Sequence, residues 1–316
     1  MTSLLERFLT PSLRAELGGL RTARGFGLDD LIRSGVANPD SSVGVYAPDA
    51  ESYATFAALL EPIVLAHHEL TELPEVSPTD ALFEREHPVL DGVVSTRIRV
   101  ARNLAGHALP AGLDRDERRA VEAALVDALR SLPGDLAGTH HRLVDLSPDE
   151  RRGLIGDHLL FKDGDRFLEA AGITRDWPDG RGIFLSDDRR LVAWVNEEDH
   201  LRLISMQDGG DLGEVADRLG RAHAHLAARL EFASDPRLGR LASCPSNLGT
   251  GMRASVHARP AEVDAAVWRA RGIQVRGVHG EHSEAAGGVY DLSPIRRLGV
   301  TPDDVLETLA AACRLS

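Results

Sequence analysis

An acidic stretch between two apolar runs is the strongest chemical signal in the sequence. Residues 196–200 read Asn-Glu-Glu-Asp-His, and the flanking runs 191–195 and 201–206 are typical of buried strands. A connection between two strands usually holds Gly, Asn or Asp, and carboxylates near a core are costly unless they are paired or used. We therefore expect this turn, with Glu198 at its centre, to handle a cation.

Arginines accompany the acidic turn. Arg97 and Arg99 are two residues apart in a predicted strand, so both guanidinium groups lie on one face. Arg202 follows the acidic turn, and Arg253 and Arg276 lie in two further predicted strands. Arginines that point from strands into one cleft suit a polyanion such as a nucleotide triphosphate. The sequence has no Gly-rich phosphate loop, so side chains rather than backbone would hold the phosphates.

Two further segments contribute reactive groups. Cys244 stands in a turn before the predicted strand 252–258, and Gly-Glu-His at 280–282 follows the predicted strand 273–278. Each signal also has an ordinary explanation when taken singly. Cys244 fits a small buried hydrophobe, Glu281 fits a solvated loop residue, and Arg97 and Arg99 fit exposed arginines of a strand. Their order and spacing together favour one shared site.

Composition sets the limits of class and location. The chain has 316 residues, 43% hydrophobic and 27% charged, which is ordinary for a globular protein of two domains. A net charge of −13 argues against nucleic acid as a partner. Cys244 and Cys313 fit no zinc or disulfide spacing. No run approaches the ~18 apolar residues that span a bilayer, and none reads as a signal peptide, so we expect a cytoplasmic protein without a membrane partner.

The chain divides into a helical part and a mixed part. Residues 1–75 read as helical, with the clearest helix from Asp49 to about Leu70. Residues 73–88 are rich in proline and acids, which predicts a linker and a domain boundary near residue 78. We therefore expect domains at 1–77 and 78–316.

The second part mixes helices with strands that are joined by short connections. Helices are predicted at 114–132, from the capping box at Ser147, and at 211–230. Hairpin-length connections predict a largely antiparallel sheet, and thus an α+β fold. The predicted strands are 93–100, 183–186, 190–196, 201–207, 252–258, 273–278 and 288–292.

Taken together, these segments resemble the phosphagen (guanidino) kinases, and within that family those that phosphorylate free L-arginine. The resemblance covers nearly the whole chain. The segments that carry it are 95–99, 157–161, 194–202, 204–207, 244–250, 253–257 and 280–282. It implies an all-helical N-terminal domain and a C-terminal catalytic domain with a curved antiparallel sheet of the glutamine-synthetase type.

The resemblance also implies roles for individual residues. Glu198 and Glu281 would grip the substrate guanidinium, and Cys244 would contact it as a thiolate, with Ser246 able to lower the thiol pKa through a hydrogen bond. The remaining roles concern the nucleotide and the amino-acid end of the substrate. The implied nucleotide ligands are Arg97, Arg99, His158, Arg202, Arg253 and Arg276, and the implied substrate ligands are Ser41, Ser42, Val43 and Tyr46.

The implied reaction is reversible phosphoryl transfer between ATP and a guanidine. Mg²⁺ would arrive on ATP or ADP and be held by phosphates and water, so no protein metal ligand is expected. The implied partners are the two small-molecule substrates, and the implied state is a monomer, with a dimer left open.

The segment 35–53 matches the kinases of L-arginine in length and wording, whereas kinases of smaller guanidines carry a longer loop. Two residues depart from the family pattern: Ser42 stands where glycine is usual, and His279 stands where an arginine is frequent. The alternatives are a kinase of another small guanidine, a protein-arginine kinase, and a non-catalytic sensor of ATP or arginine. The helical N-terminal module argues against the second, and the retained acids and arginines argue against the third.

Overall fold

The structure, a computed structural model, describes residues 2–76, 81–260, 264–277 and 288–314. The predicted domain boundary near residue 78 and the predicted site residue Glu281 lie outside these ranges. No helix within them is long and apolar enough to cross a membrane.

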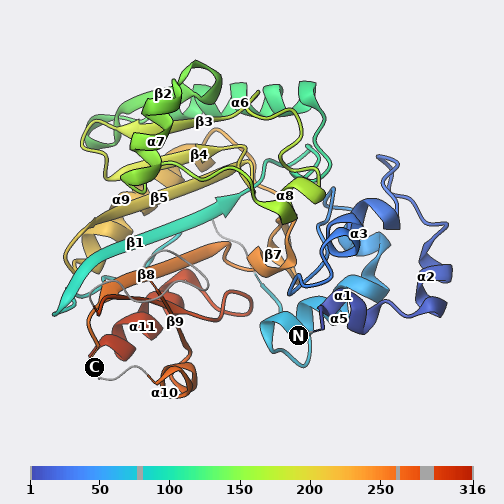
Figure 1. Ribbon diagram of the computed structural model, residues 1–316. Coiled ribbons are helices and arrows are strands. Elements are labelled where there is room, and N and C mark those ends of the chain that lie inside the picture. The colour runs from blue at the N-terminus through green and yellow to red at the C-terminus, as the bar shows by residue number, and fades with distance from the viewer. Residues whose placement is uncertain (1, 77–80, 261–263, 278–287, 315–316) are drawn as a thin grey trace.

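The N-terminal part is helical, as the sequence predicts, and Figure 1 shows its helices beside the sheet. A separate apolar cluster, which includes Leu31 and Ile63, holds them together. The helices are α1 (Leu4–Phe8), α2 (Pro11–Leu17), α3 (Leu28–Ala37), α4 (Ser52–Thr55) and α5 (Ala57–His68).

The single helix predicted from Asp49 to Leu70 is wrong in one respect, because the structure divides it into α4 and α5. Phe56, between them, leaves the helical conformation (φ −109°, ψ 30°) and is fully buried. Packing of this ring therefore overrides the helical period. Asp49 does not cap the long helix but accepts a hydrogen bond from the backbone N–H of Ser52 at 2.8 Å.

The second part is built on an antiparallel sheet, in which eight strands of the described residues follow the order β2-β3-β4-β5-β1-β8-β10-β9. All the predicted strands are present. The strand β2 was not predicted, because its Thr-His-His sequence shows no apolar alternation. The strands are β1 (Val93–Arg102), β2 (Gly138–Arg142), β3 (Gly182–Ser186), β4 (Leu191–Val195), β5 (Leu201–Asp208), β8 (Met252–Ala258), β9 (Ile273–Gly277) and β10 (Tyr290–Pro294), with β6 (Ser234–Asp235) and β7 (Gly239–Arg240) forming a separate ribbon.

Local capping signals set the starts of the helices in this part. Asp114 caps α6, Ser147 and Glu150 form the predicted capping box of α7, and Asp211 caps α9. A further box, Thr301 with Asp304, starts α11 and was not predicted. The helices are α6 (Arg115–Arg130), α7 (Pro148–Gly156), α8 (Arg166–Ala170), α9 (Leu212–Ala227), α10 (Ala265–Ala270) and α11 (Pro302–Cys313), with 3₁₀ turns η1 (Gly134–Leu136), η2 (Leu143–Asp145) and η3 (Pro245–Asn247).

The two faces of the sheet differ in chemistry. Ile98 and Val100 of β1 point into the main core, to which α6, α9 and α11 contribute their apolar faces. Because side chains alternate along a strand, Arg97 and Arg99 lie on the opposite face. That face carries a second apolar cluster around Trp194 at the β3–β5 end. The sheet thus presents a polar surface beside an aromatic one.

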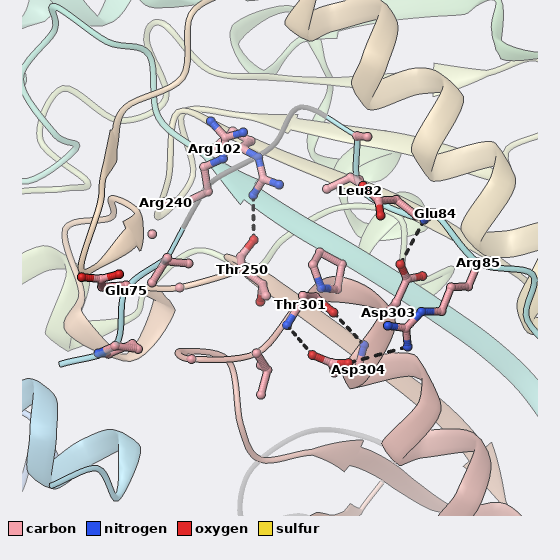
Figure 2. A pocket seen from close by; sticks show the side chains of 18 residues that line it. Glu75, Leu82, Glu84, Arg85, Arg102, Arg240, Thr250, Thr301, Asp303 and Asp304 are labelled. Carbon is pink, nitrogen blue, oxygen red and sulfur yellow. Dashed lines mark hydrogen bonds and ion pairs between the residues drawn. The ribbon is translucent and has the colours of Figure 1, made fainter. Parts of the chain in front are cut away.

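The segment 81–90 is anchored to α11 through Asp303. Asp303 accepts a hydrogen bond from the backbone N–H of Glu84 at 3.0 Å and lies 2.9 Å from Nε2 of His87. Both side chains of the Asp303–His87 pair are buried. Figure 2 shows Asp303 and Glu84 beside a cavity of about 390 Å³, and a cavity of about 560 Å³ lies between the segment and α9. Asp303 is therefore a buried polar anchor between α11 and this segment.

Replacing Asp303 with alanine should destabilise the protein. The substitution leaves the Glu84 N–H and the His87 ring without their buried acceptor, which costs about 1–3 kcal/mol. Urea unfolding at pH 7 measures the change. The control is Glu307→Ala, which removes only an exposed ion pair with Arg85 and should barely move the midpoint. Equal effects of the two substitutions would contradict the anchoring role of Asp303.

Candidate active site

The antiparallel register brings the predicted arginines together on one face. Arg99 on β1 lies directly opposite Arg253 on β8, and Arg202 on β5 lies opposite Ala101. Neighbours of Arg202 and Arg253 in their own strands point into the main core, so these two side chains lie on the same face as Arg99. The same alternation places Arg276 of β9 there.

The acidic turn between β4 and β5 is shaped by two asparagines. Asn196 adopts the left-handed conformation (φ 55°), and its side chain donates to two buried carbonyls at 2.7 and 3.0 Å. Asn103 donates to Asp199 Oδ1 at 3.0 Å and accepts the backbone N–H of His200 at 2.9 Å. These bonds stabilise a turn whose sequence is unusual for a hairpin.

Arg202 is paired with all three carboxylates of this turn. Its Nη1 lies 2.8 Å from Glu197 and its Nε 3.2 Å from Asp199, and its Nη2 pairs with Glu198. Burial alone would lower the pKa of Arg202, but the three carboxylates raise it above the ordinary value. Burial raises the pKa of Glu197 and of Asp199, with Arg202 opposing it. In Glu198 the opposing effect, chiefly of Arg202, outweighs burial and lowers the pKa, so this carboxylate is ionised.

The loop 41–46 forms one wall of a cavity of about 550 Å³. The backbone N–H of Gly44 donates to Ser41 Oγ at 3.0 Å. Gly44 has a φ of +83°, and a Cβ there would lie 2.7 Å from Leu5, so this position requires glycine. Ser42 is exposed and is not among the residues with positive φ, so serine at this position introduces no backbone strain.

Glu198 and Cys244 line the same cavity. The backbone N–H of Ala47 donates to the carbonyl of Ser243 at 2.7 Å, which joins the loop to the chain just before Cys244. The predicted substrate ligands of the loop 41–46 therefore share one cavity with Glu198 and Cys244, which lie far from the loop in sequence.

The resemblance implies a thiolate at Cys244 beside the bound substrate, and the structure shows the surroundings of this thiol without the substrate. The predicted contact with Ser246 is present, with Sγ and Oγ 3.0 Å apart. Burial nevertheless raises the pKa of the Cys244 thiol to about 12, and the charge of Glu198 adds to the effect. Ser246 opposes the rise without outweighing it, so the thiol stays protonated in the absence of a cation.

A second cavity of about 470 Å³ lies over the aromatic end of the sheet and includes the predicted nucleotide ligands Arg97 and His158. The guanidinium of Arg97 lies 5.4 Å from the centre of the Trp194 ring. Within the described part of the chain, Nε and Nη2 of Arg97 are buried without a hydrogen-bond partner. Burial, with Arg253 nearby, lowers the pKa of Arg97 to about 10. A bound anion would satisfy both nitrogens.

Arg99 and Arg202 connect the two cavities, because both side chains line both of them. Arg253 lies beside them in a third recess and donates to Asp291 Oδ1 at 2.7 Å. Burial and the charges of Arg202 and Arg253 lower the pKa of Arg99 well below its ordinary value. Arg276 lines the cavity of Glu198 and Cys244. Cations thus crowd the junction of the two cavities, where an anion would relieve their repulsion.

Several residues that were not predicted as site residues also line these cavities, and three of them are polar groups close to the predicted ones. Asn247 donates to Glu198 Oε1 at 3.0 Å, and it stands inside the family-like segment 244–250, so a signal for it existed. Arg297 lines the same cavity, and it was hidden because arginine is the usual cation of this chain. Lys162, the only lysine, lines the Arg97 cavity.

The described residues offer no ready metal site, since no three His, Cys, Asp or Glu side chains among them could hold a metal ion. The arrangement as a whole places an ionised carboxylate for a cation beside a cluster of arginines for a polyanion. Such a pair of adjoining subsites is what phosphoryl transfer from a nucleotide to a cationic acceptor requires.

The fold and this pair of subsites define a phosphotransferase, and the family comparison agrees. Residues 1–65 match the model of the ATP:guanido phosphotransferase N-terminal domain, and residues 120–315 match that of its C-terminal catalytic domain. The chain belongs to this family, the phosphagen kinases.

Within the family, the chain is similar to several arginine kinases. It is 47% identical to the arginine kinase of Anthopleura japonica over 95% of its own length, although it spans only 44% of that protein. It is 44% identical to arginine kinase Oct f 2 of Amphioctopus fangsiao, covering 95% of this chain and 89% of the relative.

Solved structures of other phosphagen kinases share the fold. A lombricine kinase superposes with a TM-score of 0.93 at 34% identity, covering 99% of this chain and 90% of that one. The duplicated taurocyamine kinase of Schistosoma mansoni, with transition state analog components bound, superposes with a TM-score of 0.93 at 35% identity. The match covers 99% of this chain and 45% of that one. These neighbours confirm the predicted α+β fold and the kinase family, and they leave the guanidine open.

In the ligand-free protein, the rate at which iodoacetamide alkylates Cys244 should keep rising with pH and reach no plateau. Because the thiol pKa is raised to about 12, the thiolate fraction is small at pH 7 and grows about tenfold per pH unit up to pH 10. Peptide mass spectrometry follows Cys244 and Cys313 separately. Ser246→Ala should slow the reaction at Cys244 and spare Cys313. A rate at Cys244 that levels off near pH 8 would show a thiolate already present.

Proposed function

We propose that the protein is an ATP:guanidino phosphotransferase that transfers the γ-phosphate of ATP reversibly to the guanidinium of free L-arginine. One observation carries the proposal. Glu198 and Cys244 share a cavity with the loop 41–46, and Arg99 and Arg202 line both this cavity and that of Arg97. A guanidinium and a triphosphate bound in the two cavities would meet at these arginines.

Glu198 is proposed to align the substrate guanidinium. A guanidinium has a pKa above 12, so full deprotonation before transfer would cost roughly 7–9 kcal/mol at pH 7. An ionised carboxylate with a lowered pKa is too weak a base to supply this in the ground state. Alignment of two reactants can lower a barrier by ~7–11 kcal/mol. Glu198 therefore orients the acceptor nitrogen, and a carboxylate, Glu198 or Glu281, accepts its proton as the N–P bond forms.

The arginines and Cys244 are proposed to balance charge. Arg97, Arg99 and the other strand arginines would neutralise the triphosphate, with His158 beside the adenosine and Mg²⁺ supplied by the nucleotide. Binding of the substrate cation would favour the thiolate of Cys244, because the nearby positive charge offsets the effect of Glu198. Cys244 would then stabilise the cation and would not attack it.

Free L-arginine is the proposed acceptor for two reasons. The loop 41–46 is short and closely held by the contacts at Gly44 and Ala47, which leaves room for a long substrate. The arginine kinases of Anthopleura japonica and Amphioctopus fangsiao are also 47% and 44% identical to this chain. The lombricine and taurocyamine kinase folds favour another guanidine as the second candidate. A monomeric, cytoplasmic enzyme remains our expectation.

The activity is tested by ADP release from Mg-ATP with L-arginine, creatine, glycocyamine, taurocyamine, lombricine or an arginine-rich protein. We expect turnover with L-arginine and much less with the others. Turnover with another small guanidine would keep the reaction and overturn the specificity. Turnover with the protein alone would identify a protein-arginine kinase, and no turnover with any acceptor would favour a sensor.

Glu198→Gln should abolish turnover and leave the affinity for the nucleotide unchanged. The neutral amide cannot pair with the guanidinium or accept its proton, so kcat should fall by about 10²–10⁴-fold. Calorimetry with Mg-ADP should give an affinity near that of the unaltered protein. Glu214→Gln, at an exposed ion pair, is the control. Full turnover in Glu198→Gln would contradict the mechanism.

A further inference from the structure

Arg297 makes two side-chain contacts with the turn that carries Cys244. It follows strand β10, and its Nη1 donates to the backbone carbonyl of Ser246 at 3.2 Å and to Asn247 Oδ1 at 3.1 Å. Its own backbone carbonyl accepts the N–H of Thr250 at 2.9 Å. Side chain and backbone of Arg297 therefore hold both ends of the same short turn.

The direction of the hydrogen bonds fixes the amide of Asn247. A guanidinium only donates, so it requires the amide oxygen, and the amide nitrogen then faces Glu198 Oε1 at 3.0 Å. An ionised carboxylate only accepts, so the arrangement Arg297–Asn247–Glu198 is complementary at each step. The other oxygen of Glu198 pairs with Arg202. Glu198 is thus held from two sides.

The same arginine also reaches the thiol. Ser246, whose carbonyl accepts from Arg297, has its hydroxyl 3.0 Å from Cys244 Sγ. Two groups of the proposed guanidinium site, Glu198 and Cys244, are therefore linked to one side chain. Arg297 is surrounded by Arg202, Arg253 and Arg276, and burial with these charges lowers its pKa to about 10. A cation in this place is costly to the fold unless the site uses it.

We propose that Arg297 is a positioning residue, which orients Glu198 through Asn247, and Cys244 through Ser246, toward the substrate guanidinium. This inference rests on the proposed function. Because Arg297 acts through the turn, its loss should impair alignment and thus turnover, while the nucleotide cavity around Arg97 stays intact. Two other roles make different predictions. A phosphate ligand would lose nucleotide affinity, and a purely structural residue would lose thermal stability and both substrates together.

The test compares Arg297→Gln, Asn247→Ala and the double substitution with a matched control, Arg296→Gln, at the exposed neighbouring arginine. Each single substitution should lower kcat with L-arginine by roughly 10- to 100-fold, as misalignment does. The double substitution should be no worse than the worse single one by more than about 2-fold, because both break the same chain of bonds. The Kd of Mg-ADP, measured by calorimetry, should stay within about 2-fold of that of the unaltered protein.

Two results would overturn the inference. One is a fall in Mg-ADP affinity that matches the fall in kcat, which would make Arg297 a phosphate ligand. The other is full additivity of the two substitutions, which would separate Arg297 from Asn247. Arg297→Lys, which keeps the charge but not the planar fork, should keep the nucleotide affinity of the unaltered protein and should not recover kcat.

A readout without turnover separates this inference from the proposed function. Arg297→Gln should weaken the contact of Ser246 with Cys244 and slow alkylation of Cys244, as Ser246→Ala does, whereas Arg296→Gln should leave the rate unchanged. If the unaltered protein turned over no guanidine, the proposed function would fail while this result could still stand. An unchanged alkylation rate in Arg297→Gln would show that Arg297 does not hold the turn.

Discussion

The pairing of Arg202 with Glu197, Glu198 and Asp199 is the constraint on which the rest of the cleft depends. Three carboxylates in one turn repel one another, and burial alone would drive each toward its neutral form. Arg202 pairs with all three carboxylates, but its effect on their pKa values differs. It leaves Glu198 ionised, while the pKa values of Glu197 and Asp199 are raised. One carboxylate of defined charge therefore faces the cavity, and its partner Arg202 borders the neighbouring cavity as well.

Much of this arrangement follows from the sequence through one rule, the alternation of side chains along strands. The two-residue spacing of Arg97 and Arg99 predicted that they share one face of the sheet. The same rule, applied to the observed strands, places Arg202, Arg253 and Arg276 on that face as well. The other face of the sheet is covered by the apolar core that α6, α9 and α11 complete, so the arginine side chains could not lie there. Capping residues such as Asp114 and Ser147 likewise placed helix starts correctly, because their hydrogen bonds are local.

Interactions between distant segments were not predictable in the same way. Phe56 breaks a periodic helix because of where its ring packs, and β2 pairs with β3 although its own sequence shows no strand pattern. The protonated state of Cys244 depends on burial and on Glu198, neither of which the Cys-Pro-Ser-Asn motif reveals. Arg297 carried no local signal at all, since its partners at 246 and 247 lie about fifty residues earlier in the chain.

In the proposed reaction both substrates occupy the joined cavities at once, and phosphate passes directly between them. Initial-rate kinetics with Mg-ATP and L-arginine varied together tests it most directly. Direct transfer predicts double-reciprocal lines that intersect, because a ternary complex must form before product leaves. Parallel lines, with exchange of label between ADP and ATP in the absence of arginine, would indicate a phosphorylated enzyme and contradict the account.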